Sequence, residues 1–228
     1  MSDNELHEKY IKILLNDIFT NKIWDFLAFK WWTLAYLLHE LDRFSTDIDL
    51  DLIDIDREQD VVEEVRKILS IHWDIKNETL WKSIHRWIFR YDEKNMNIKV
   101  EINKTIHKNN NYEKINIENI NINCMSKESI FSNKLVALSE RFYNRDLYDV
   151  HFFFRKNFPL QESLIIERTD LTVKEFLWKL IKELPNQFRE NTILSWLWEV
   201  LNNKQKHRVK KYLLSETIEY LENYLNKV

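Results

Sequence analysis

The spacing of apolar and polar residues along the chain changes its period twice. Residues 5–20 carry apolar side chains on one helical stripe, which predicts an amphipathic helix. From about residue 72 to 123 the pattern becomes strand-like, and after Cys124 it returns to helix. The expected strands of that middle part lie near 85–92, 96–103 and 114–122, and the later helices at 127–142, 145–157, 172–184, 190–201 and 204–225. We therefore predict an α+β fold, a mixed sheet with helices followed by a helical C-terminal half.

The stretch 27–53 is the part around which the rest is arranged. It predicts a short strand at about 26–30, the pair Trp31-Trp32, and a helix capped by the hydroxyl of Thr33. A second strand then carries acidic residues, and a further helix is expected at 57–71. This order places a tight turn and a helix start next to an acidic strand.

The acidic strand has a strict two-residue alternation. Asp47, Asp49 and Asp51 fall on one of its faces, because successive strand side chains point in opposite directions. Asp47 and Asp49 can both reach a magnesium ion, which prefers oxygen ligands. Glu101 would supply a third carboxylate if its strand is a neighbour, and Lys99 shares its face. A solvated face of an edge strand explains the aspartates equally well.

Two basic groups of residues could answer this negative charge. Lys134, Arg141 and Arg145 share one face if their helix continues through Asn144, and a basic face suits a triphosphate. Ordinary surface ion pairs of Arg145 with Asp149 are the alternative. A second cluster could hold RNA phosphates or be a solvated helix end, and it comprises Lys204, Lys206, His207, Arg208, Lys210 and Lys211.

Composition narrows the class of protein. Hydrophobic residues make up 44% of the 228, enough for a core, and a net charge of −3 leaves nucleic-acid binding to local patches. A single cysteine, no long apolar run and no signal-peptide pattern indicate a cytoplasmic protein without membrane association. No linker separates the two halves, so we expect a core at 1–125 and a helical region at 126–228 that share the active-site cleft.

Glycine is absent from the chain, whereas average usage of about 7% would give roughly 16 residues. Tryptophan occurs 9 times, including the adjacent pair Trp31-Trp32. The abundance of Asn, Ile and Lys indicates an AT-rich gene, which would thin out glycine but does not explain the tryptophans.

The ordered blocks resemble a known family. FLAFKWWTLAYLLHELDRFSTDIDLDLI is similar to the signature of the nucleotidyltransferase AbiEii/AbiGii toxin family, in which a glycine turn and helix precede Arg-x-Ser-x-Asp-x-Asp. The later segment NKLVALSERFYNRDLYDVHFF resembles that family's Lys and Arg-Asp-x-x-Asp block, and IKVEIN resembles the strand with the third acid.

The resemblance implies a polymerase-beta-like core and Mg²⁺-dependent transfer of nucleotides from a nucleoside triphosphate to an RNA such as tRNA. It also implies the role of a toxin in an abortive-infection type of toxin–antitoxin system, with a cognate antitoxin as partner. The residues it marks as catalytic are Asp47, Asp49, Glu101, Lys134, Asp146 and Asp149, of which Asp47, Asp49 and Glu101 would hold the metal. Those marked as nucleotide-binding are Trp31, Trp32, Thr33, Arg43, Ser45, Lys134, Arg141 and Arg145.

The chain departs from the family at the turn, where Trp31-Trp32 replaces Gly-Gly. Glycines there let the backbone approach phosphates at a helix N-terminus, and indoles would fill that space. A genetic code that reads UGA as glycine would explain both the missing glycines and this pair, and Trp24 and Trp198 also stand where glycine would be unsurprising. Trp178 and Trp196 lie in apolar helical stretches, where a large aromatic packs well.

Two other functions stay open from sequence. The chain as written could be a non-catalytic binding module that keeps the fold and the antitoxin contact. It could also be a nucleotidyltransferase that modifies a small molecule, as antibiotic-modifying enzymes do.

Overall fold

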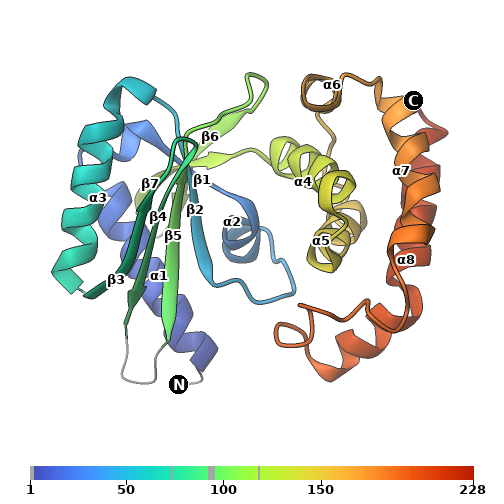
Figure 1. The fold of residues 1–228 in the computed structure, drawn as a ribbon, viewed down its shortest axis with the longest axis horizontal. Coiled ribbons are helices and arrows are strands. Elements are labelled where there is room, and N and C mark those ends of the chain that lie inside the picture. Colours follow the sequence, from blue (N-terminus) through green and yellow to red (C-terminus); the bar gives the residue numbers. More distant parts are fainter. Residues whose placement is uncertain (1–2, 73, 92–95, 118) are drawn as a thin grey trace. The chain divides into compact units, whose positions relative to one another are not determined.

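The computed structural model describes residues 3–72, 74–91, 96–117 and 119–228 (Figure 1). The chain forms two compact units. The first contains residues 1–106 and 112–125, and the second contains residues 107–111 and 126–228. Each unit is built around its own set of buried apolar side chains.

The first unit is a seven-stranded mixed sheet with helices. Its helices are α1 (Asp3–Phe19), α2 (Trp31–Leu38) and α3 (Glu58–His72), with short 3₁₀ turns at Trp24–Phe26 and Ile55–Arg57. Its strands are β1 (Leu27–Lys30), β2 (Asp47–Leu52), β3 (Asp74–Leu80), β4 (Ile84–Arg90), β5 (Asn97–Asn103), β6 (Tyr112–Ile117) and β7 (Ile120–Met125). The strand order is β3-β4-β5-β2-β1-β7-β6. The pairs β2–β5 and β1–β7 are parallel and the others antiparallel, so the prediction of a mixed sheet is confirmed.

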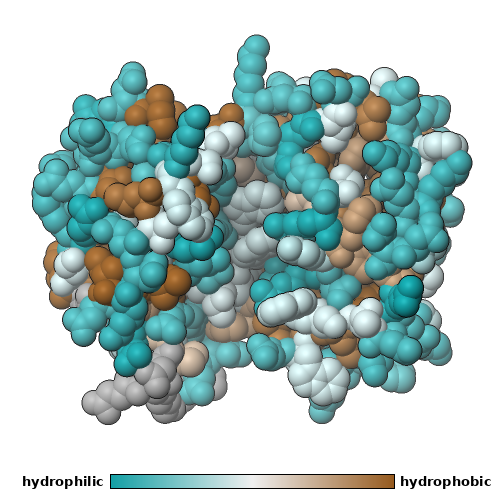
Figure 2. Space-filling model, viewed as in Figure 1, coloured by the Kyte–Doolittle hydropathy of each residue, from teal (hydrophilic) through white to brown (hydrophobic). Residues whose placement is uncertain are grey.

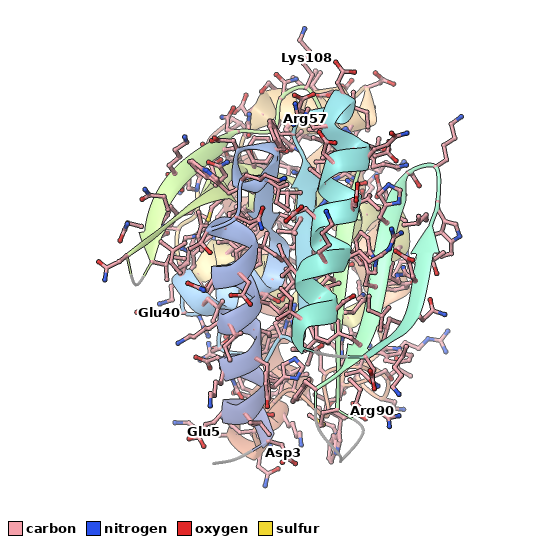
Figure 3. The ribbon with its side chains drawn as sticks, turned by 90° about the vertical axis from the view of Figure 1, so that its left-hand side faces the viewer. Asp3, Glu5, Glu40, Arg57, Arg90 and Lys108 are labelled. Carbon is pink, nitrogen blue, oxygen red and sulfur yellow. The ribbon has the colours of Figure 1, made fainter. Side chains whose placement is uncertain are left out.

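The two faces of the sheet differ in character because strand side chains alternate. Ile48 and Leu50 of β2 lie on the apolar face, in register with buried residues of β5 and β4 such as Val100 and Trp87. This face packs on the helix layer, where Glu58 of α3 lies 2.7 Å from the Nε2 atom of His85 in β4. Figure 3 shows α1, with Asp3 and Glu5 labelled, beside α3 in front of the sheet. The aspartates of β2 therefore lie on the opposite, polar face.

Two local predictions for this unit were wrong, and one strand was missed. Segment 114–122 is two strands rather than one, and the chain reverses between them next to Asn119, which has φ of 71°. Asparagine tolerates this left-handed region, so the hairpin forms without glycine. Thr33 lies inside α2 instead of capping it, because the helix begins two residues earlier. The strand β3 was not predicted separately, and residue 92, expected at the end of β4, lies outside the described residues.

The second unit is helical. Its elements are α4 (Lys127–Arg141), α5 (Asn144–Arg155), α6 (Glu162–Thr169), α7 (Val173–Gln187) and α8 (Asn203–Leu225). The segment 107–111 belongs here because the Glu167 carboxylate of α6 accepts the backbone N–H of Lys108 and of Asn109, at 2.7 and 2.8 Å. None of the described helices is long and apolar enough to span a membrane. On the face drawn in Figure 2, most of the exposed side chains are hydrophilic.

Two helix predictions for the second unit were wrong. The segment 190–201 forms consecutive turns rather than a helix, and Trp196 within it has φ of 64°. A residue in that region cannot continue a right-handed helix. Helix α4 ends at Arg141, because Phe142 adopts φ of 49° before α5 begins. Lys134, Arg141 and Arg145 therefore do not share one continuous helix face.

A buried histidine links α1 to the segment that leads into β2. The Nε2 atom of His7 lies 2.9 Å from the Thr46 carbonyl oxygen, and Nδ1 lies 2.7 Å from the Tyr91 hydroxyl. In the neutral ring, Nε2–H donates to Thr46 and Nδ1 accepts from Tyr91. Burial lowers the pKa of His7 below its usual value, against the opposing effects of Thr46 and the Asp47 charge. His7 thus holds the start of β2 while uncharged.

We predict that His7 makes the fold sensitive to acid. Because its pKa is lower in the folded chain than in the unfolded one, the unfolded state binds more protons near and below pH 6.5. The free energy of unfolding is therefore expected to fall as the pH drops from about 7 towards 5, and His7→Gln should flatten this dependence. Urea titrations at several pH values measure it. The exposed His207→Gln is the control, and equal slopes for the two variants would contradict the prediction.

Candidate active site on the polar face of the sheet

The acidic residues predicted from the sequence come together on adjacent strands. β2 and β5 run parallel in a register that sets Asp47 opposite Lys99 and Asp49 opposite Glu101. Asp47, Asp49 and Glu101 therefore lie on one face of the sheet, as the alternation predicted if the strands were neighbours. The polar face is thus a continuous feature of two parallel strands and not an isolated solvated edge, since β2 is an interior strand.

Asp49 is the most unusual group on this face. Asp49 is only 8% exposed to solvent, and its Oδ2 atom has no hydrogen-bond partner. Burial, together with the nearby Asp47 charge, raises the pKa of Asp49 to about 7 against the lowering effect of Lys30. A buried carboxylate oxygen without a partner is costly, because it loses hydration with no compensation. A bound cation would supply that compensation.

Asp47 and Glu101 form ion pairs with basic side chains of β4 and β5. The Lys99 Nζ atom lies 2.9 Å from Asp47 Oδ2 and 3.4 Å from Glu101 Oε1. Arg86 Nε donates to Glu101 Oε1 at 2.5 Å. Although burial lowers it, the Asp47 and Glu101 charges raise the pKa of Lys99 above its usual value, so the ammonium stays charged. Arg86 was missed by sequence reasoning, because only the register of β4 on β5 brings it beside Glu101.

The donor set fits magnesium in part. Among the described residues no three carboxylate, imidazole or thiol side chains gather into a group that could hold a metal. Magnesium, however, is commonly bound through one or two carboxylates together with substrate phosphates. Asp47 and the unpartnered oxygen of Asp49 can serve as such a pair, whereas Glu101 is engaged by Arg86 and Lys99.

We predict that Lys99→Met raises the affinity of this face for Mg²⁺ several-fold. The ammonium sits where it repels an incoming cation, and part of that repulsion is screened because the side chain is 31% exposed. Magnesium titration followed by the shift in melting temperature measures the effect. Lys104→Met serves as the control, since Lys104 pairs with Glu58. Unchanged or weaker Mg²⁺ binding by Lys99→Met would show that Lys99 does not compete.

Asp51, the third aspartate of the alternation, has a different role. Its carboxylate accepts from Lys30 Nζ at 2.6 Å and from the Tyr112 hydroxyl at 2.8 Å, and both Asp51 and Lys30 are buried. This ion pair joins β1 to β2 directly before the turn into α2. Asp49 and Asp51 lie two residues apart on the same strand, but both carboxylate oxygens of Asp51 have partners whereas Oδ2 of Asp49 has none.

The start of α2 lies close to β2 through two hydroxyls. Thr33 Oγ1 lies 2.9 Å from Ser45 Oγ and also hydrogen-bonds the backbone carbonyl of Asp47. Thr33 and Ser45 are both buried, so they brace the helix start against the strand. Arg43, also buried, has its guanidinium 5.5 Å from the centre of the Trp32 ring. Of the predicted phosphate-binding residues, Thr33 and Ser45 therefore lie beside Asp47, and their contact with phosphate stays a prediction.

The backbone at this helix start is unusual. Trp31 has φ of 67°, and Lys30, in the cap position, makes no side-chain cap. The Trp31 and Trp32 rings lie 5.3 Å apart, and Lys30 Nζ lies 5.4 Å from the Trp31 ring. Two indoles thus occupy the surroundings of the first turn of α2.

The second predicted cluster forms inside the helical unit. Lys134 of α4 is 0% exposed, and its Nζ atom lies 2.8 Å from Asp146 Oδ1 and 3.4 Å from Asp149 Oδ2. Arg141 Nε donates to Asp146 Oδ2 at 2.6 Å. Burial raises the pKa of Asp146, but Lys134 and Arg141 together bring it below its usual value. These charges join α4 to α5, and the catalytic or phosphate-binding roles of Lys134, Asp146 and Asp149 stay predictions.

Arg145, for which the surface-pair alternative expected Asp149 as partner, binds the turn segment that follows α7. Its Nε atom donates to the backbone carbonyl of Trp196 at 2.7 Å. Arg145 therefore fixes the turn segment that follows α7 to the start of α5. Asp146 and Asp149 are buried, so the sequence spacing had suggested a surface that the fold does not form.

Comparison with known proteins gives a family and two related folds. Residues 33–195 match the family model described as "Nucleotidyl transferase AbiEii toxin, Type IV TA system". The crystal structure of JHP933 from Helicobacter pylori has a TM-score of 0.57 and 18% identity, and the alignment covers 100% of this chain and 97% of that one. A candidate nucleotidyltransferase from H. pylori also has a TM-score of 0.57, with 21% identity over 98% and 99% of the two chains.

No curated protein matches the chain. At such low identity the two crystal structures show a shared fold, which spans both units of this chain. The family match, in contrast, covers well over half of the residues and includes the acidic strand, Glu101 and the Lys134 cluster. The chain belongs to the nucleotidyl transferase AbiEii toxin family.

Proposed function

We propose that the protein is a Mg²⁺-dependent nucleotidyltransferase that moves a nucleotide from a nucleoside triphosphate to an RNA acceptor such as tRNA. As the toxin of a toxin–antitoxin pair, it would be neutralised by a cognate antitoxin protein. Family membership supports the nucleotidyltransferase and the toxin role. The metal and the RNA acceptor are the further steps that this proposal adds.

The observation that carries the proposal is the unpartnered Oδ2 atom of Asp49 on a buried polar face. It lies on the same strand face as Asp47, next to Glu101, and beside the start of α2. A structural aspartate in such a position would be paired, as Asp51 is with Lys30. An unpaired one fits a residue that meets its partner only when substrate and cation arrive.

The chemistry follows from these positions. Asp47 and Asp49 would hold Mg²⁺, which supplies charge neutralisation at the triphosphate and stabilises the attacking and leaving oxygens of an in-line displacement. A hydroxyl oxygen of the acceptor attacks the α-phosphorus, and pyrophosphate leaves. Glu101 lies opposite Asp49 and can accept the hydroxyl proton once Arg86 and Lys99 turn to the phosphates. Ser45 and Thr33 then lie where the triphosphate meets the start of α2.

A basic surface in the helical unit supports an RNA acceptor. Lys204, Lys206, Lys210 and Lys211 lie in the first half of α8, and within the described part of the chain none of them forms a salt bridge. Arg208 in the same stretch pairs with Glu216 at 3.2 Å. Lysines without carboxylate partners attract phosphates and make binding sensitive to salt. This gives a place for an acceptor that is itself a polyanion.

The experiment is transfer of an α-³²P-labelled nucleotide to total RNA. Each of the four labelled nucleoside triphosphates is incubated with the full chain, Mg²⁺ and RNA, and the RNA is then resolved by size. The proposal expects labelled RNA that requires Mg²⁺ and disappears with Asp47→Asn or Asp49→Asn. Labelling by Asp49→Asn equal to that of the unaltered chain would reject it, because a contaminating enzyme would then be responsible.

The indoles at residues 31 and 32 favour a second function for the sequence as written. Their rings crowd the first turn of α2, where a triphosphate would need open backbone N–H groups. A non-catalytic binding module that keeps the fold and the antitoxin contact is consistent with that crowding. Equilibrium dialysis of a labelled nucleoside triphosphate with Mg²⁺ distinguishes the binding module from the nucleotidyltransferase. A chain whose helix start is blocked by the indoles should bind no nucleoside triphosphate.

A further inference from the structure

Residue 31 is held in a backbone conformation that suits glycine. It connects β1 to α2 with φ of 67°, in the left-handed region. In this region the Cβ atom of an L-residue crowds the carbonyl oxygen, and bulky residues are rare there. The conformation is enforced from both sides, because Lys30 is fixed by its ion pair with Asp51 and Thr33 by its bonds to β2. Tryptophan is therefore a poor occupant of this position.

Residue 196 combines the same backbone conformation with an exposed indole. Trp196 has φ of 64° and is 78% exposed to solvent. The carbonyl of this residue accepts from Arg145, so the turn has a defined partner that does not depend on the indole. The size of a tryptophan usually favours the fold because its ring is buried, whereas most of Trp196 is exposed to solvent. Glycine would meet the backbone requirement without exposing the ring.

Other residues with positive φ show that the chain needs this conformation at several turns. Three of them, Asn119, Asn157 and Asp170, are residue types that tolerate it, and Glu40 and Phe142 lie just beyond helices. A chain of 228 residues with seven positive-φ positions in its described part and no glycine at all is unusual. Two of those seven positions are occupied by tryptophan, the residue type in excess.

Trp87 shows what a tryptophan required by the fold looks like. Its ring is fully buried in β4, and its Nε1–H donates to Glu78 Oε1 at 2.6 Å. Trp32 and Trp198 do not have positive φ, so the backbone makes no demand for glycine there. The tryptophans that the structure describes thus divide into different kinds, and Trp196, which the sequence had placed in an apolar helix, belongs with Trp31.

From this contrast we infer that residues 31 and 196 are glycine in the protein as its own cells make it, with UGA read as glycine, and that Trp87 is tryptophan. The consequence for α2 is direct. Glycine at 31 removes an indole from the helix start and leaves the backbone N–H groups of the first turn open to an anion. The inference concerns the chain itself and holds whether or not the proposed nucleotidyl transfer is correct.

Mass spectrometry of the native protein tests the assignment. Trypsin releases residues 31–43, 87–90 and 190–204 as separate peptides, because each follows and ends at Lys or Arg. Glycine in place of tryptophan at 31 and 196, with tryptophan kept at 87, is the expected result. Fragment ions that show tryptophan at 31 or at 196 would overturn the inference for that position.

A stability comparison tests the physical reason independently. Recombinant chains are made with codons of a single meaning, and glycine is compared with alanine at each position, so that both variants lack the indole. Glycine should resist urea better than alanine at 31 and at 196, because only glycine escapes the Cβ crowding. Trp178, exposed within α7, is the matched control, and there alanine should be the more stable. Alanine equal to or better than glycine at both 31 and 196 would contradict the inference.

Discussion

Replacing Asp49 by asparagine is expected to abolish nucleotidyl transfer and, without Mg²⁺, to make the fold more stable. The loss of transfer should be at least about a hundredfold, since the charge opposite the reacting phosphate is gone. The gain in the free energy of unfolding should be about 1–3 kcal/mol, because a buried carboxylate oxygen without a partner is exchanged for a neutral amide. Urea unfolding in EDTA and the RNA-labelling assay measure the two effects.

Asp51→Asn is the control for the prediction that Asp49→Asn loses activity while its fold becomes more stable. Asp51 lies two residues along the same strand but is paired with Lys30 and Tyr112, so its loss should destabilise the fold. If Asp49→Asn destabilised the chain as Asp51→Asn does, Asp49 would be a structural residue and the active-site assignment would be wrong. Added Mg²⁺ should stabilise the unaltered chain and leave Asp49→Asn unchanged.

Lys134→Met is expected to lower the free energy of unfolding of the helical unit by about 3–5 kcal/mol. The substitution removes the Lys134 ammonium, which lies within 3.4 Å of both Asp146 and Asp149, and both of these carboxylates are buried. Uncompensated buried charge makes the loss larger than that of the packing removed. Urea unfolding followed by far-ultraviolet circular dichroism measures it.

Two comparisons make this prediction specific. Arg145→Met removes a half-buried cation whose Nε atom donates to the Trp196 backbone carbonyl, and it should cost far less. The double substitution Lys134→Met with Asp149→Leu should recover part of the loss, because the buried charge is removed with its partner. A loss below about 1 kcal/mol for Lys134→Met would mean that the cluster does not hold α4 to α5.

The polar face could be predicted from the sequence because it depends on alternation alone. Asp47 and Asp49 share a face in any strand, and the match of IKVEIN to a second strand correctly indicated that Glu101 would be close. The register of β4 decides that Arg86 reaches Glu101, and no local pattern encodes that register. The partners of Asp51 could not be predicted either. Lys30 belongs to β1 and Tyr112 to β6, one before and one far after β2 in the sequence.

The errors in the helical half have a common physical cause. The segment 190–201 has helical periodicity, but a positive φ at Trp196 ends any helix there. The same conformation at Phe142 separates α4 from α5. Lys134 of α4 is buried, where an amphipathic reading had placed it on a surface. In most proteins glycine marks such positions, and this sequence contains none to mark them.

Binding of Mn²⁺, followed by electron paramagnetic resonance, tests the central claim that the polar face holds a catalytic cation. Mn²⁺ replaces Mg²⁺ at oxygen ligands and loses its free-ion signal when bound. The parent chain for this test carries glycine at residue 31 as its one change. With a nucleoside triphosphate analogue that cannot be cleaved, this parent chain is expected to bind Mn²⁺ beyond the amount held by the analogue alone. Asp47→Asn and Asp49→Asn should lose this binding, and Asp51→Asn should keep it wherever it folds. Equal Mn²⁺ binding by this parent chain and by its Asp49→Asn variant would contradict the claim that the polar face holds a catalytic cation.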